Sequence, residues 1–255
     1  MNRILAFSKR NIKELIRDPL SYVFCLGFPL IMLILMTIIN DMIPPEADMT
    51  LFRIDQLTPG VAVFGLSFIM LFATLLLSKD RSGAFLVRLF ATPMTALDFI
   101  VGYVLPLFAV AVAQLVICLG AGGVIGLITA TSLSPWRLLL TLVTLLPCAL
   151  FFIAMGLIFG TLLGDKAAPP CSSILISACG ILGGIWFSLD TVPEGHVFGI
   201  ICRALPFSHF VDAGRQALTG QFQDFGAHMA IGLAWAVGAS VLAVAVFHFR
   251  MKRNA

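Results

Sequence analysis

The chain has 255 residues, of which 60% are hydrophobic and 11% are charged; 16 Lys and Arg stand against 13 Asp and Glu, and the mean hydropathy is +1.03. This composition excludes an ordinary soluble domain, because folding in water would leave large apolar surfaces uncovered. We therefore expect an all-α integral membrane protein with a single transmembrane domain over residues 1–255. Its polar stretches should mark the parts that meet water or a partner.

The N-terminal segment, residues 1–18, is predicted to be an amphipathic helix on the inner membrane surface. Its apolar and basic residues are spaced to fall largely on opposite faces: Ile4, Leu5, Ile12, Leu15 and Ile16 on one, and Arg3, Lys9, Arg10, Lys13 and Arg17 on the other. Anionic lipid attracts such a helix, and Asp18-Pro19 would end it. The alternative is a solvated tail whose positive charge only keeps it inside.

Six charge-free stretches are long enough to span about 30 Å of hydrocarbon, which takes about 20 mostly apolar residues. These predicted spans are Ser21–Ile39, Leu57–Leu77, Phe99–Ala130, Leu138–Leu163, Ala167–Leu189 and Met229–Phe247. The third is longer than one crossing needs, and its glycines at 120, 122, 123 and 126 suggest where the helix loosens. Gly156 and Gly160, in the fourth, would allow close helix packing.

The distribution of basic residues sets the expected orientation, because cytoplasmic loops retain an excess of Lys and Arg. With the N-terminus inside, 12 of the 16 basic residues lie on the cytoplasmic side and 4 on the other. We therefore expect a multi-pass protein of the cell membrane with both termini cytoplasmic.

The segment between the second and third spans, residues 79–98, is a charged island that begins with Lys79, Asp80 and Arg81. Gly83 and Pro93 bracket residues 84–92, a predicted helix of about two and a half turns. Its large apolar side chains cluster on one side, with Arg88 opposite or flanking: Phe85, Leu86, Leu89 and Phe90. Such a helix needs a groove in another protein or in lipid headgroups. The alternative is a loop helix that lies on the membrane.

The long outer segment before the last span, residues 190–227, mixes apolar stretches with Pro193, Pro206, Asp212 and Arg215. It is too short and broken to span the bilayer. It could form a re-entrant hairpin of short helices, which is tolerated where protein or water satisfies the backbone. The alternative is an ordinary extracellular loop.

No catalytic or metal site is predicted in this chain. The sequence contains no G-x-x-x-x-G-K-[ST], H-E-x-x-H or G-x-S-x-G motif and no C-x-x-C pair, and its four histidines lie at loops or span ends. Ionisable residues within spans mark proton relays and ion-coupled carriers, yet Gln114 is the most polar side chain in the middle of a predicted span. A proton-driven carrier and an intramembrane enzyme are therefore disfavoured, and no cofactor or nucleic acid is expected to bind.

An ordered set of short motifs resembles the permease subunits of type-2 ATP-binding-cassette exporters (ABC-2 permeases), particularly the drug-export branch. The motifs are Arg17-Asp18-Pro19, Phe28-Pro29-Leu30, Leu57-Thr58-Pro59-Gly60, Lys79-Asp80-Arg81-Ser82-Gly83, Arg88-Leu89, Thr92-Pro93-Met94, and Leu205-Pro206-Phe207-Ser208-His209-Phe210-Val211-Asp212-Ala213 followed by Arg215. Each is weak alone, but their order covers nearly the whole chain.

The resemblance implies that residues 79–98 contain a coupling helix that docks into a separate cytoplasmic ABC ATPase carrying MgATP. The residues implied to couple to that partner are Arg81, Gly83, Phe85, Arg88, Leu89 and Pro93. It further implies two permeases, as a homodimer or heterodimer, with two ATPases. Substrate would leave along the dimer interface, and the path residues we name are Phe64, Phe68, Phe72 and Phe187; the alternative is that these rings face lipid or pack together.

The sequence favours an ATP-driven exporter of an amphipathic or hydrophobic substrate such as a drug or lipid. The alternative is a membrane anchor or scaffold that holds a cytoplasmic partner without transport. Only an exporter should change its partner's ATP hydrolysis when substrate is present.

Overall fold

A computed structural model describes residues 2–19, 23–44, 50–82, 95–193 and 195–254. Within these ranges every regular element is a helix. The elements are α1 (Asn2–Ile16), the π-helical η1 (Val23–Gly27), α3 (Phe28–Met42), α4 (Ile54–Ser82), α6 (Ala96–Ile128), α7 (Pro135–Leu162), α8 (Ala168–Leu182), the 3₁₀-helical η3 (Leu189–Thr191), α9 (Val197–Ala204), α10 (Pro206–Thr219) and α11 (Phe225–Asn254). The expected all-α membrane protein is confirmed.

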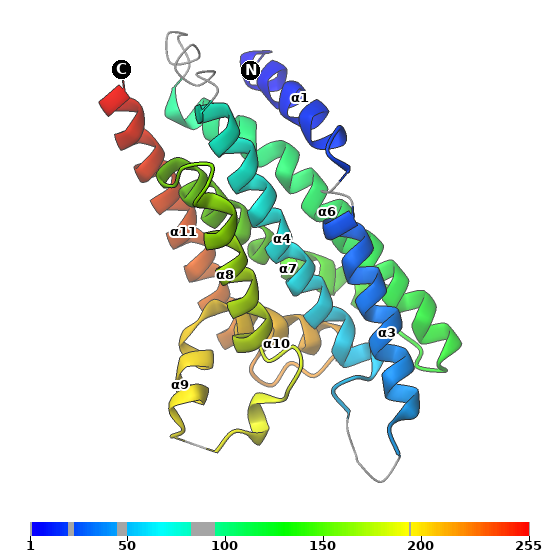
Figure 1. The fold of residues 1–255 in the computed structure, drawn as a ribbon. Helices are drawn as coiled ribbons and strands as arrows, with labels where there is room; N and C mark the ends of the chain where they lie inside the picture. The colour runs from blue at the N-terminus through cyan, green and yellow to red at the C-terminus, as the bar shows by residue number, and fades with distance from the viewer. Residues whose placement is uncertain (1, 20–22, 45–49, 83–94, 194, 255) are drawn as a thin grey trace.

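The long helices run alongside one another as a bundle (Figure 1). Both termini and α1 lie at one end, which we call the α1 end; α9 and α10 lie at the other, the α10 end. Helix α4 forms the centre, with 78% of its apolar stretch buried, against 17% for Val23–Met42 and 28% for Phe225–Arg250. The apolar residues of those outer helices face the surroundings, as expected of a bundle whose solvent is lipid.

Five helices are long and apolar enough to cross a membrane, and they correspond to the predicted spans one to four and six. The fifth predicted span, Ala167–Leu189, is wrong at its end. Helix α8 has 15 residues and stops at Leu182, which gives it a length of only about 22 Å. Gly183 and Gly184 end it, and Gly184 has a φ of +62°, a conformation that glycine adopts without strain. The count of six crossings stays a prediction.

The third predicted span does not loosen at its glycines, so that expectation is wrong. Helix α6 continues unbroken to Ile128. The absence of a side chain at Gly122 instead allows α6 to approach α4, since a Cβ there would lie 2.5 Å from the Thr58 side chain. In this span a glycine marks close packing between helices.

The predicted close packing at Gly156 and Gly160 is confirmed. A Cβ on Gly156 would lie 2.5 Å from the Met70 carbonyl oxygen of α4. At the same level the Thr74 hydroxyl lies 3.2 Å from the Gly156 carbonyl oxygen and accepts a hydrogen bond of 3.1 Å from Ser172 of α8. Helices α4, α7 and α8 are therefore joined by backbone approach and by a short chain of hydroxyl contacts.

Polar contacts also hold the α10 end together. The Arg215 guanidinium donates to the Gln56 carbonyl oxygen at 3.1 Å and lies 3.6 Å from the Asp212 carboxylate. His209 Nε2 lies 2.8 Å from the Arg203 carbonyl oxygen, and His209 Nδ1 lies 2.8 Å from His228 Nδ1. Residues 190–227 thus contain two short helices, α9 and α10, and their re-entry into the membrane stays a prediction.

Candidate functional site at the α1 end

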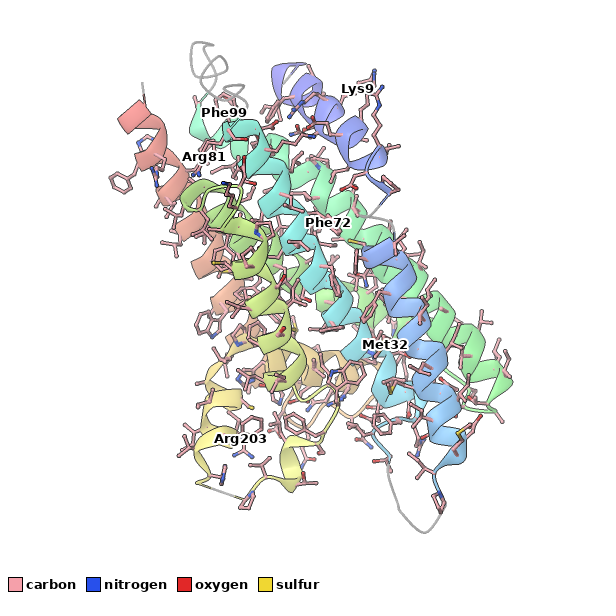
Figure 2. All side chains as sticks on the ribbon, in the orientation of Figure 1. Lys9, Met32, Phe72, Arg81, Phe99 and Arg203 are labelled. Carbon is pink, nitrogen blue, oxygen red and sulfur yellow. The ribbon has the colours of Figure 1, made fainter. Side chains whose placement is uncertain are left out.

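The predicted coupling segment, residues 79–98, is described at its two ends. Its middle, residues 83–94, lies outside the described residues, and with it Gly83, Phe85, Arg88, Leu89 and Pro93. Helix α4 extends five residues beyond the predicted span end at Leu77, so residues 79–82 form its last turn. Thr95 begins α6. Both ends lie at the α1 end of the bundle, where Figure 2 labels Arg81 and Phe99.

Asp80 is the centre of a polar cluster that joins three helices. Its side chain is only 3% exposed, and both of its carboxylate oxygens accept hydrogen bonds from Arg10 of α1, at 2.5 and 2.6 Å. The Tyr103 hydroxyl of α6 donates to the same carboxylate at 2.7 Å. A buried carboxylate is stable only when it is paired and hydrogen-bonded, and here a two-pronged Arg contact and a phenol meet that need.

Arg10 is held between two carboxylates. Besides Asp80, it contacts Glu14 one turn along α1 at 2.8 Å. Burial lowers the pKa of Arg10, but the hydrogen bond and the charge of Asp80, with a contribution from Glu14, outweigh burial and raise that pKa. The guanidinium therefore stays charged at any physiological pH.

Helix α1 docks on α6 at a carbonyl group that a proline leaves free. Pro106 has no N–H, so the carbonyl of Gly102, four residues earlier, lacks its partner within the helix. Asn11 Nδ2 donates to that oxygen at 3.0 Å and Ser8 Oγ at 3.3 Å. The missing side chain at Gly102 makes room for the Phe7 ring, which a Cβ there would overlap. The sequence of α6 thus builds the docking position for α1.

The prediction of a helix at the N-terminus is confirmed, but the division of its faces is partly wrong. Phe7, Ser8, Asn11 and Leu15 are buried against the bundle, whereas Leu5 and Ile16 are 53% and 60% exposed. The basic residue Arg10 points inward to Asp80 rather than outward with the other cations. The reason is that α1 packs on protein along one side, where polar groups find partners in α4 and α6. Its position on the membrane surface stays a prediction.

Arg81 ties the end of α4 to the end of α7. Its guanidinium donates to the Leu163 carbonyl oxygen at 2.5 Å and also to the Thr161 carbonyl oxygen. The last carbonyls of a helix have no partner within it, and a cation there also complements the helix dipole. The structure places Arg81 in this internal contact, and its role toward a partner ATPase stays a prediction.

A capping box starts α6 directly after the undescribed residues. The Asp98 carboxylate accepts from the Thr95 backbone N–H at 2.8 Å, and the Thr95 hydroxyl accepts from the Asp98 N–H at 3.3 Å. One turn later Phe99 packs edge-on against Phe7, with 5.8 Å between ring centroids. The start of α6 is thereby fixed in position and packed against α1.

The four predicted path residues do not form one group. Phe64 and Phe68 pack together with 5.5 Å between their centroids, and Phe28 of α3 contacts both. Phe72 is buried away from this aromatic group and lines an apolar cavity beside α1. Phe187 follows α8 and contacts Phe198 of α9 at 5.5 Å. A substrate path along these rings stays a prediction.

The sequence comparison identifies the family. The family model described as ABC-2 type transporter matches residues 2–219, which run from α1 through α10. The chain belongs to the ABC-2 type transporter family. It is accordingly a membrane-spanning permease subunit of an ABC transporter, without catalytic activity of its own, and the family normally works with an ATP-binding subunit. No curated protein matches the chain.

Sequence reasoning missed most of the polar cluster in this ABC-2 permease. Asp80, Tyr103, Ser8 and Asn11 received no role, and no contact between α1 and α6 was expected. One signal was present: Tyr103 is one of two tyrosines in the chain and lies near the end of a span, where a hydroxyl needs a partner. Pro106, which frees a carbonyl, was a second.

Proposed function

We propose that this ABC-2 permease is the transmembrane subunit of an ATP-driven exporter. It moves an amphipathic or hydrophobic substrate, such as a drug or a lipid, out of the cytoplasm or the inner leaflet. A separate cytoplasmic ABC ATPase binds and hydrolyses MgATP and docks on residues 83–94. Two permeases, identical or related, work with two ATPases in the cell membrane, with both termini in the cytoplasm.

The observation that carries this proposal is the anchoring of both ends of the docking segment. Before it, Asp80 and Arg81 tie α4 to α1, α6 and α7. After it, the capping box at Thr95 fixes the start of α6. Force applied to the docking segment is transmitted to the membrane-spanning helices only if the residues at both ends of that segment are held in place. Anchoring of this kind serves force transmission, whereas a scaffold that only binds a partner does not need it.

The orientation is supported by the position of the termini and of the cations. Both termini lie at the α1 end, together with the last turn of α4 (Figure 1). The exposed basic residues there include Lys9, Lys13, Lys79 and Lys166. The positive-inside rule supports a cytoplasmic position for this end, where the proposed ATPase would dock.

The nature of the substrate is supported by the apolar character of the bundle. Phe64 and Phe68 of α4 form an aromatic group with Phe28 of α3. Along the middle of α4 no charged side chain occurs between Asp55 and Lys79. Apolar and aromatic surfaces bind hydrophobic cargo, and a carrier of ions or free sugars would present more polar groups.

Purification from native membranes tests the partner. The tagged chain and the double variant Phe85→Ala/Arg88→Glu are purified gently, and the proteins that accompany each are identified. A stoichiometric P-loop ATPase with the unaltered chain, lost in the double variant, supports the proposal. An ATPase that stays with the variant shows that the docking site is elsewhere. Absence of any ATPase contradicts the exporter and favours the membrane anchor.

The variant Asp80→Asn tests transmission separately from docking. We expect the ATPase to remain bound while stimulation of its ATP hydrolysis by substrate falls at least several-fold, because α4 is released from α1. Asp41→Asn, an exposed carboxylate in the last turn of α3 at the other end of the bundle, serves as the control and should behave as the unaltered chain. Equal stimulation in the Asp80→Asn complex would contradict the role of the cluster.

A further inference from the structure

An apolar cavity of about 240 Å³ lies between α1, η1, α4 and α6. Helix α1 contributes Ile12, Leu15 and Ile16 to its wall, and α6 contributes Pro106, Ala109 and Ala113. Every lining side chain is apolar. Apolar cavities of this size do not hold water, because water would find no hydrogen-bond partners there, but they accept apolar ligands.

The cavity reaches the surface of the bundle where α6 carries small side chains. Ala109 and Ala113, four residues apart, are both exposed and lie on the same side of the helix. Ile16 at the opposite wall is 60% exposed. An extended chain can therefore enter from the lipid-facing surface without crossing the core, which a buried cavity within the bundle would not permit.

A basic stripe borders the cavity on α1. Lys9 and Lys13 are one helical turn apart and lie next to Ile12 and Ile16 on the helix surface. Both lysines are exposed, and Lys9 extends away from the bundle in Figure 2. In contrast to Arg10, they have no ion pair among those found in the described residues. An apolar slot with cations at its edge matches a molecule with an acyl chain and an anionic head.

We propose that this cavity is a binding site for one anionic phospholipid of the leaflet at the α1 end. One acyl chain lies in the slot between α1 and α6, and the phosphate contacts Lys9 and Lys13. Occupancy fills the space behind Leu15 and holds the last turn of α1 against α6. The preceding part of α1 is already held by Phe7 and Asn11 on α6 and by Arg10 on α4. The proposal goes beyond the transport function and does not depend on it.

Native mass spectrometry of the detergent-purified chain, with phosphatidylglycerol or phosphatidylcholine added, tests the site. We expect one phosphatidylglycerol per chain to be retained in preference to phosphatidylcholine. Ala109→Trp fills the slot and should abolish this retained lipid, whereas Ala234→Trp, at an exposed alanine of α11, should not. Equal retention of the two lipids, or retention in Ala109→Trp, overturns the proposal.

The contribution of lysine charge is tested with Lys13→Gln. The control is Lys166→Gln, at another exposed lysine. A lysine near an anionic headgroup strengthens binding by about five-fold, so Lys13→Gln should reduce the preference for phosphatidylglycerol by about that factor. Lys166→Gln should leave the preference unchanged. An equal loss in both variants means that the chain attracts anionic lipid only through its overall charge, and that result overturns the specific site.

Photocrosslinking of the unaltered chain provides a test that does not depend on the folding of a variant. Phosphatidylglycerol with a photoreactive group in its acyl chain is added in bilayers, and crosslinked residues are mapped. We expect crosslinks concentrated at Leu26, Ala109 and Ala113. Crosslinks spread evenly over the exposed faces of α3, α6 and α11 indicate ordinary boundary lipid and overturn the proposal. A failure here leaves the ATPase purification unaffected, so the two proposals are tested separately.

Discussion

The two ends of the bundle hold their charged groups in different ways. At the α1 end, Arg10 meets a carboxylate, Asp80, that is 3% exposed and shared with Tyr103. At the α10 end, Arg215 meets backbone carbonyl oxygens and the partly exposed Asp212. Its side chain borders a cavity of about 420 Å³ with mostly polar walls, to which Gln216, Asp224 and His228 also contribute.

The difference concerns how easily each end can rearrange. Water can replace a carbonyl oxygen as the partner of an arginine when a polar cavity lies beside it. Water cannot replace Arg10 without reaching the Asp80 carboxylate, which is 3% exposed and enclosed by three helices. The α1 end should therefore keep its geometry. At the α10 end, Arg215 can exchange its hydrogen-bond partners for water at a small cost in free energy. Under the proposed export function, the more rigid end is the one on which the ATPase would act, and the more adaptable end is the one from which substrate would leave.

The largest expected effect comes from Arg10→Ala compared with Arg215→Ala. Removing Arg10 leaves Asp80 buried with one phenol as its partner, which should cost about 3 kcal/mol of unfolding free energy. Removing Arg215 should cost only about 1 kcal/mol, because water in the adjacent cavity satisfies the carbonyls. Thermal and denaturant unfolding in detergent measure both, with Arg17→Ala, an exposed arginine, as the control. Equal losses would remove the distinction between the ends.

The next effect concerns the close approach of α1 to α6. Gly102→Ala adds a methyl group that overlaps the Phe7 ring, and overpacking of this kind costs about 1–3 kcal/mol. Gly120→Ala, in the same helix, meets nothing within 4 Å and should be neutral or slightly stabilising. If both substitutions behave alike in unfolding experiments, α1 is not seated on Gly102.

A smaller effect should appear at the free carbonyl of Gly102. Asn11→Ala removes its better donor and should cost about 1 kcal/mol. Pro106→Ala restores an N–H four residues along α6, so in the Pro106→Ala background the same Asn11→Ala change should cost less. A double-mutant cycle measures this coupling. Additive losses would show that the proline and the asparagine do not serve the same oxygen.

The smallest effect is a pH dependence at the α10 end. His209 Nε2 must donate to the Arg203 carbonyl, so neutral His209 accepts from His228 through Nδ1. Burial, together with the proximity of His228, lowers the pKa of His209 despite the nearby Asp212. Stability is therefore complete above about pH 6.5, the ordinary histidine value, and is lost as pH falls toward the lowered pKa.

Melting temperatures on the two sides of that window measure the histidine effect. The unaltered chain should melt at a lower temperature on the acid side, and His209→Gln should lose most of the difference. His248→Gln, at an exposed histidine of α11, should retain it. An unchanged difference in His209→Gln would assign the pH dependence to other groups.

The sequence predicted the architecture well because each span is a local property. About 20 apolar residues without charge identify a membrane helix wherever it packs. Five of the six predicted spans correspond to long helices for this reason. The exception is the span predicted over Ala167–Leu189, whose apolar sequence continues past Gly183 and Gly184 although these two glycines end the helix. Hydropathy alone does not predict the backbone conformation at which a helix ends.

The polar cluster could not be predicted from sequence patterns within a short segment, because its members are far apart in the chain. Arg10 and Asp80 are separated by 70 residues, and Asn11 and Gly102 by 91. Arg10 looked like one more cation of a basic face, and Asp80 like part of a solvated loop. Only the packing of α1 against α4 and α6 distinguishes them from Lys9 and Lys79, which are exposed.

Because α1 packs on α6 at Gly102, this contact can form only after α6 has been synthesised. The N-terminal helix leaves the ribosome first, yet its docking surface, from Gly102 to Pro106, is translated about ninety residues later. Until the third span has been inserted, Asn11 lacks the Gly102 carbonyl oxygen that it donates to, and Asp80 lacks the hydrogen bond from Tyr103. A nascent chain that stalls before that point therefore has an N-terminal helix that has not docked on α6.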